Sequence, residues 1–156
     1  MKKLIVLLAA LAAISAIVAG SAFAGASPTT CGSNDPQHAE QLHSTVLGNL
    51  TVPAGTWCVV GGNEIKGVAN VYGHLISFGA TFDTNVVVDG GSFQGMNGYT
   101  TILGNLNISN SAGDPNSPMG GTQNGFWGPG NRIAKNLNLI NSPGFYTDGS
   151  NLTIGS

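Results

Sequence analysis

The sequence predicts an all-β fold, a single-stranded parallel β-solenoid of about six coils, from three observations. A seven-residue phrase of the form I-x-G-N-L-x-V recurs along the chain, most clearly at 46–52 and 102–108. Its copies follow one another at a period near twenty residues, which is typical of stacked repeat units. The fifth and seventh positions are apolar in every copy, and this alternation places both side chains on one face of a strand.

The fourth position of the phrase is the second regular feature. It is occupied by Asn49, Val68, Asn85, Asn105, Asn136 and Asn151, with successive steps of 19, 17, 20, 31 and 15 residues. Asn tolerates turn conformations and bonds readily to nearby backbone groups. We therefore expect the five Asn residues to stack at one corner of the solenoid as a hydrogen-bonded ladder. The sixth copy, at 148–154, is the weakest.

Residues 1–24 have the features of a secretory signal. Lys2 and Lys3 precede an apolar stretch, 4–18, and an A-x-A cleavage sequence follows at 22–24. An apolar stretch of about fifteen residues is short for a membrane span, which disfavours the alternative of an uncleaved anchor. The sequence therefore predicts a secreted protein, outside the cell or at its surface, with the periplasm as an alternative. We expect no membrane span after the signal is removed.

Cleavage would leave 132 residues with three basic and seven acidic side chains, a net charge near −4. That length suits one domain. Proteins that bind nucleic acids use basic surfaces to displace counterions from phosphates, so we expect no nucleic-acid partner. Within this domain, residues 25–45 lack the repeat and the solenoid occupies 46–156.

The segment 25–45 is expected to cap the first coil. Asp35 followed by Pro36 is a helix-start signal, which predicts a short helix from Pro36 to His43. Cys31 and Cys58 are the two cysteines of the chain. In an oxidising compartment two thiols in a small domain usually pair, and a metal site would lack a nearby third ligand. We therefore expect a structural disulfide that ties the cap to the first coil.

One coil carries a long insertion, 111–130, rich in Gly, Pro, Asn and Ser. Insertions of this kind map to loops on the solenoid surface, and loops of such length are often functional. At the other extreme, the chain stops at Ser156, two residues after Ile154, without a recognisable C-terminal cap. Either another molecule covers the final coil or the chain is truncated.

The phrase I-x-G-N-L-x-V and the V-P-A-G-T-W-C segment at 52–58 resemble a known group of proteins. They are similar to secreted bacterial right-handed parallel β-helix proteins, pectin-lyase-like solenoids, of the repetitive and mostly uncharacterised kind. The likeness covers residues 46–154 and implies a right-handed coil. Because this fold includes polysaccharide lyases and hydrolases, tailspike-like proteins, adhesins and polymer-forming scaffolds, it does not choose among activities.

Few residues carry chemistry. Glu64 and Asp83 precede the ladder positions of adjacent coils, so they could approach each other as the two carboxyl groups of a glycosidase do. The alternative, which we favour, is that both are solvated turn residues, and no catalytic residue is assigned. Phe126 and Trp127, at the end of the insertion, are the candidate binding residues because exposed aromatic rings stack on sugars. Their alternative role is to fill a core position of a second strand.

No metal or cofactor is expected. His38 and His43 are five residues apart, which separates them by about 140° on a helix, so they would not converge on one ion. The residues together favour an exported, non-catalytic β-solenoid that is a structural or adhesive element at or outside the cell surface. Two alternatives remain. One is a carbohydrate-binding or polysaccharide-degrading domain, with an extracellular glycan as partner, and the other is a filament subunit that self-associates through its coil ends.

Overall fold

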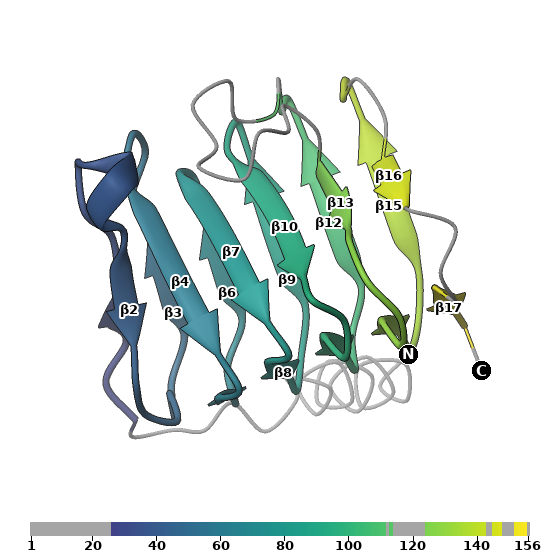
Figure 1. The fold of residues 1–156 in the computed structure, drawn as a ribbon, viewed down its shortest axis with the longest axis horizontal. Helices are drawn as coiled ribbons and strands as arrows, with labels where there is room; N and C mark the ends of the chain where they lie inside the picture. The colour runs from purple at the N-terminus through teal and green to yellow at the C-terminus, as the bar shows by residue number, and fades with distance from the viewer. Residues whose placement is uncertain (1–25, 112, 114–123, 143–144, 148–151, 156) are drawn as a thin grey trace, which may run out of the picture.

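The computed structural model describes residues 26–111, 113, 124–142, 145–147 and 152–155. Three parallel sheets stack along one axis, and the chain passes from the third to the first to the second sheet in each turn (Figure 1). This arrangement confirms the predicted all-β parallel solenoid. The predicted signal, 1–24, lies outside the described residues, and no helix in the described part of the chain is long and apolar enough to cross a membrane.

The first sheet is formed by the second half of each repeated phrase. Its register places the fifth positions, Leu50, Ala69, Val86, Leu106 and Leu137, opposite one another. The residues between the apolar positions face outward and are less buried, as the alternation predicts. The strands, in spatial order, are β1(Thr29–Thr30), β3(Leu50–Val52), β6(Ala69–Val71), β9(Val86–Asp89), β12(Leu106–Ser109) and β15(Leu137–Ile140).

The other two sheets complete each turn. The second sheet contains, in spatial order, β16(Phe145–Thr147), β13(Asn124–Phe126), β10(Ser92–Met96), β7(His74–Phe78), β4(Trp57–Gly61) and β2(Glu40–Leu42). The third sheet, built from the first position of each phrase, contains β17(Thr153–Ile154), β14(Arg132–Ile133), β11(Thr101–Ile102), β8(Thr81–Phe82) and β5(Glu64–Ile65).

The core is a continuous apolar column inside the three sheets. One part of it is a chain of aromatic rings, in which Phe93 meets Phe82 and Phe126 edge to face at centroid distances of 6.1 and 5.6 Å. Phe126 continues to Phe145 at 5.5 Å. Gly95 makes room for this chain, because a Cβ there would lie 2.2 Å from Cδ1 of Phe126. Edge-to-face packing of this kind adds to the stabilisation from burial alone.

The N-terminal segment adds strands to the solenoid. The predicted helix from Pro36 to His43 is wrong in its extent: a 3-10 turn covers only Pro36–His38, and β2 follows. The predicted start is confirmed, since Asp35 is the N-cap. The helix ends early because the exposed edge of β4 offers backbone partners to Glu40–Leu42, and parallel pairing satisfies them.

The sixth copy of the phrase is out of register with the expected alignment. Ile154 was expected to share the first sheet with Leu139, but it lies opposite Ile133 in the third sheet. Ile154 therefore occupies the first position of a phrase, and the step from Ile133 to Ile154 is 21 residues, close to the other turns. The 15-residue step of the expected alignment was too short to close a turn through three sheets.

The predicted disulfide is confirmed between Cys31 and Cys58. Both cysteines are fully buried, and their Cα atoms are 5.5 Å apart. Cys31 follows β1 and Cys58 lies in β4, so the bond joins the N-terminal segment to the first and second sheets at once.

Candidate functional site

The Asn side chains form a ladder at the corner that precedes the first sheet. Oδ1 of Asn85 accepts hydrogen bonds from the backbone N–H and from Nδ2 of Asn105, at 2.8 and 3.1 Å. Oδ1 of Asn105 accepts from the corresponding two groups of Asn136, at 3.2 and 3.1 Å. Each amide thus satisfies a backbone donor of the next turn and extends the row by one residue.

The ladder is interrupted in its second turn. Oδ1 of Asn49 accepts from the backbone N–H of Val68 at 2.9 Å, but Val68 has no polar side chain with which to continue toward Asn85. At the far end, the predicted member Asn151 lies outside the described residues. The described ladder is therefore an uninterrupted run of three amides preceded by one isolated member.

A second ladder, which the sequence reasoning missed, lies at the far end of the first sheet. Nδ2 of Asn110 donates to Oδ1 of Asp89 at 2.9 Å, and Nδ2 of Asn141 donates to Oδ1 of Asn110 at 3.3 Å. Asn110 and Asn141 have positive φ values of 53° and 48°, which Asn adopts more readily than most residues. The available signal was the Asn that follows the phrase in both of these copies, with the same 31-residue step.

The structure brings Glu64 and Asp83 together through a cation. Nζ of Lys66 contacts a carboxylate oxygen of Glu64 and lies 3.1 Å from Oδ2 of Asp83. The side chains of Lys66 and Asp83 are 25% and 23% exposed, and that of Glu64 is 43% exposed. Because the ammonium group lies between the carboxylates, it occupies the position that a glycosidic oxygen or a nucleophilic water would need.

The electrostatics of this cluster favour an ion pair. The pKa of Lys66 is raised above its usual value of 10.5, first by its hydrogen bond to Glu64 and then by that to Asp83. The lysine is therefore fully charged across the physiological range, so it cannot act as a general base there. The three residues form a charge-neutralised corner of the solenoid with a net charge of −1.

The two candidate aromatic residues have different surroundings. Phe126 is 1% exposed inside the aromatic chain, so its ring is a core side chain and is not available to a ligand at the surface. Trp127 is half-buried, and its ring centroid is 5.3 Å from that of Tyr146, with the planes tilted by 30°. Tyr146 is 40% exposed and was not singled out from the sequence. Most of the insertion, 112 and 114–123, lies outside the described residues.

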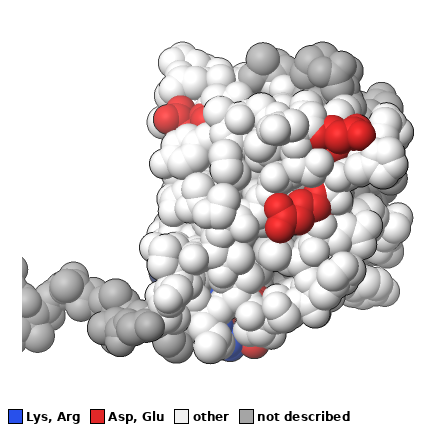
Figure 2. Space-filling model, turned by 90° about the vertical axis from the view of Figure 1, so that its left-hand side faces the viewer, with Lys and Arg blue, Asp and Glu red and all other residues white. Residues whose placement is uncertain are grey.

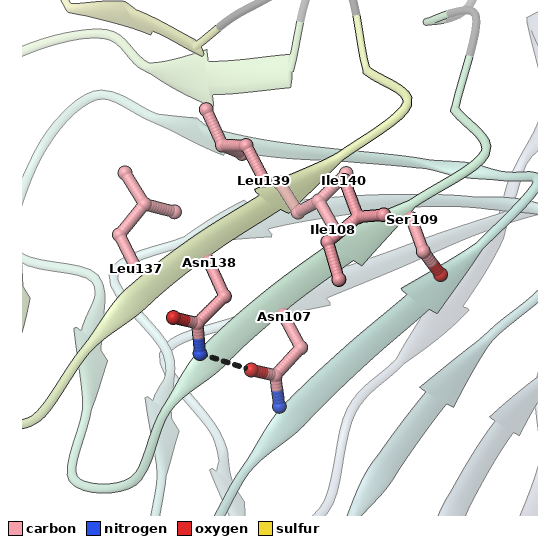
Figure 3. Close-up of a pocket in the computed structure, with 7 residues that line it drawn as sticks. All are labelled: Asn107, Ile108, Ser109, Leu137, Asn138, Leu139 and Ile140. Carbon is pink, nitrogen blue, oxygen red and sulfur yellow. Dashed lines mark hydrogen bonds between the residues drawn. The ribbon is translucent and has the colours of Figure 1, made fainter.

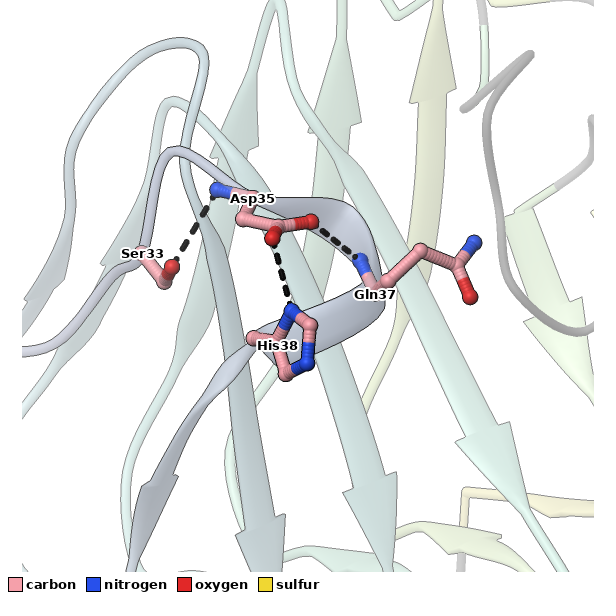
Figure 4. Close-up of polar contacts among 4 residues, drawn as sticks. All are labelled: Ser33, Asp35, Gln37 and His38. Carbon is pink, nitrogen blue, oxygen red and sulfur yellow. Dashed lines mark hydrogen bonds and ion pairs between the residues drawn. The ribbon is translucent and has the colours of Figure 1, made fainter.

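The N-terminal end carries acidic groups and an open groove. Asp35 accepts hydrogen bonds from the backbone N–H of Gln37 at 2.9 Å and pairs with Nδ1 of His38 at 2.7 Å (Figure 4). The His38 contact contributes most to lowering the pKa of Asp35 below its usual 3.8. His38 and His43 line a groove of about 470 Å³ whose floor includes Ile76. Among the described residues, no group of three metal-ligating side chains could hold an ion.

The C-terminal end has a different character. A hollow of about 460 Å³ runs along β12 and β15, lined by residues 107–109 and by all of β15. Asn138 donates to Asn107 at 2.7 Å on one side of this hollow, and the apolar side chains of β15 lie along it (Figure 3). Leu139 and Ile140 are 40% and 61% exposed, whereas Ile108, which lies opposite Leu139 one turn earlier, is 1% exposed.

Comparison with protein-family models, curated proteins and solved structures finds no match for this chain. The fold therefore depends on the strand pairing described above, and the function has to be argued from the chemistry of the described residues.

Proposed function

We propose that this chain is an exported, non-catalytic β-solenoid that is a structural or adhesive element at or outside the cell surface. The observation that carries the proposal is the state of the two candidate catalytic carboxylates. Glu64 and Asp83 are both held by Lys66, whose ammonium group fills the space between them. A glycosidase needs one free carboxylic acid and one free carboxylate that face a sugar, and this corner offers neither.

The regularity of the molecule supports a structural role. Each turn is fixed to the next by parallel backbone pairing in three sheets, by the Asn ladder and by the apolar column. Such stacking gives a rigid rod whose outer faces repeat at roughly 4.8 Å, the usual spacing of neighbouring strands. A surface of this kind suits a spacer or a repetitive contact with another surface, and needs no reactive side chain.

Incubation of the purified protein with uronate polymers, with and without Ca²⁺, tests the absence of catalysis. We expect no release of unsaturated sugar, and measurable release would overturn the proposal. Protease treatment of intact cells tests the location. We expect the protein either in the medium or removed from the cell surface by the protease, whereas full protection inside intact cells would contradict export to the surface.

A second candidate function is carbohydrate binding, which the Trp127–Tyr146 pair favours. The two rings lie 5.3 Å apart at the surface, and exposed aromatic faces stack on sugar rings. A glycan array tests it, with Tyr146→Ala compared with Tyr72→Ala, since both tyrosines are about half exposed. Binding that disappears only in Tyr146→Ala would support this function, and an array without hits would count against it.

A further inference from the structure

We propose that the C-terminal end of the solenoid binds the N-terminal end of a second copy of this chain, so that copies stack head to tail into filaments. The inference deepens the proposed structural role by naming its partner. Three observations carry it: unpaired strand edges at both ends, apolar positions uncovered at one end, and opposite charge at the two ends.

The strand edges are the first observation. β15 and β16 are the last strands of their sheets at the C-terminal end, and β1 and β2 are the last at the other end. An edge strand presents backbone N–H and C=O groups that can pair with a strand of another chain. In head-to-tail stacking, β15 would add to β1 and β16 to β2 of the next copy. All strands would remain parallel, as they are within each sheet.

The apolar positions are the second observation. Leu139 lies in the same column as Val88 and Ile108, which are 0% and 1% exposed, yet Leu139 itself is 40% exposed. Ile154 is 46% exposed, while Ile133, directly opposite it, is fully buried. These residues are core positions of the repeat that lack a following turn. A further turn of the same kind, supplied by another copy, would bury them.

Charge is the third observation, and it selects the direction of stacking. Asp35 and Glu40 are exposed at the N-terminal end, where Figure 2 shows acidic atoms over the end face and basic atoms only at its lower margin. Arg132 and Lys135 are exposed in the last turn. Head-to-tail stacking brings opposite charges together, whereas joining two C-terminal ends would bring these cations together and make the strands antiparallel. A contact between unlike ends does not close on itself, so it produces filaments.

Matched leucine variants test the apolar contact. Leu139 and Leu103 are 40% and 39% exposed, but Leu103 lies in the middle of the rod, between β11 and β12. We would measure self-association by sedimentation and by electron microscopy at several protein concentrations. Leu139→Lys should weaken it by at least about tenfold, since the burial of one leucine side chain is worth that much or more. Leu103→Lys should leave it unchanged. Equal effects of the two variants would overturn the proposal.

Charge variants test the direction independently and avoid the core. Lys135→Glu should weaken self-association, Glu40→Lys should do the same, and the double variant should restore most of it. Circular dichroism of each variant would show that the monomer remains folded. Single short rods at every concentration, or particles that stop at closed dimers, would each overturn head-to-tail stacking. Neither result would bear on the absence of catalysis, which the uronate assay decides separately.

Discussion

The Asn ladder gives the sharpest quantitative prediction for stability. The side chain of Asn105 makes three hydrogen bonds, because its Oδ1 accepts two from Asn136 and its Nδ2 donates one to Asn85. A typical hydrogen bond contributes about 0.5–1.5 kcal/mol net. Because this corner is partly exposed, water replaces some of the lost partners, and we expect Asn105→Ala to lower the free energy of unfolding by about 2 kcal/mol.

A residue two positions away provides a matched control. Asn107 is in the same turn and makes one exposed hydrogen bond, from Nδ2 of Asn138 to its Oδ1 at 2.7 Å. Asn107→Ala should therefore cost about 0.5 kcal/mol or less. Asn105→Asp separates the two roles of the amide, since it keeps an acceptor for Asn136 and loses the donor to Asn85. It should lie between the two alanine variants near neutral pH, or below them if charge repulsion with Oδ1 of Asn85 dominates.

The assay is urea denaturation followed by circular dichroism and by tryptophan fluorescence, with the midpoint and slope fitted for each variant. A loss in Asn105→Ala no greater than that in Asn107→Ala would refute the reasoning. It would mean that the ladder is a consequence of coil stacking and contributes nothing measurable to it.

Four further predictions follow from other parts of the molecule. Val68→Asn should raise the midpoint of unfolding, because an amide there would join Asn49 to Asn85 and give the backbone N–H of Asn85 an acceptor; an unchanged or lower midpoint would contradict it. Reduction of the disulfide, which closes a loop with a sequence separation of 27, should cost about 3.6 kcal/mol in the chain-entropy model, measured by urea denaturation of oxidised and reduced protein. Phe93→Ala should cost about 3–5 kcal/mol, and Phe78→Ala, on the outer face of the second sheet, should cost much less in the same measurement. Since the pKa of Lys66 is raised in the folded state, its ion pairs stabilise the protein fully below pH 10.5 and lose their effect as the pH rises through the folded value; the difference in stability between wild type and Lys66→Met should stay constant to about pH 10 and then shrink, and a difference that shrinks between pH 7 and 9 would contradict this assignment.

Most of the sheet register was predictable because it is written locally. The apolar fifth and seventh positions alternate with outward residues, and a shift by one residue would turn Leu50 or Val86 to the solvent. Stacking therefore has one favourable alignment in the first sheet. The pairing of Cys31 with Cys58 followed from their number and compartment alone.

The candidate site was less predictable. Glu64 and Asp83 could be placed near one corner from their spacing to the ladder, but the contact of both with Lys66 depends on side-chain directions at that corner. The burial of Phe126 depends on Gly95 in the neighbouring strand, which leaves the space that the ring fills. No pattern within the insertion itself carries that information.

The sequence by itself determined the repeat, the inward residues, the ladder corner and the disulfide, since each is a property of local spacing or composition. Tertiary structure decided where the pattern is ambiguous: the strand that replaced the helix after Pro36–His38, the turn to which Ile154 belongs, and the exposure of Leu139. The physical reason is the same in all three. A strand gains its hydrogen bonds and its burial from the neighbouring turn, so its state depends on which turn lies beside it and on whether one does.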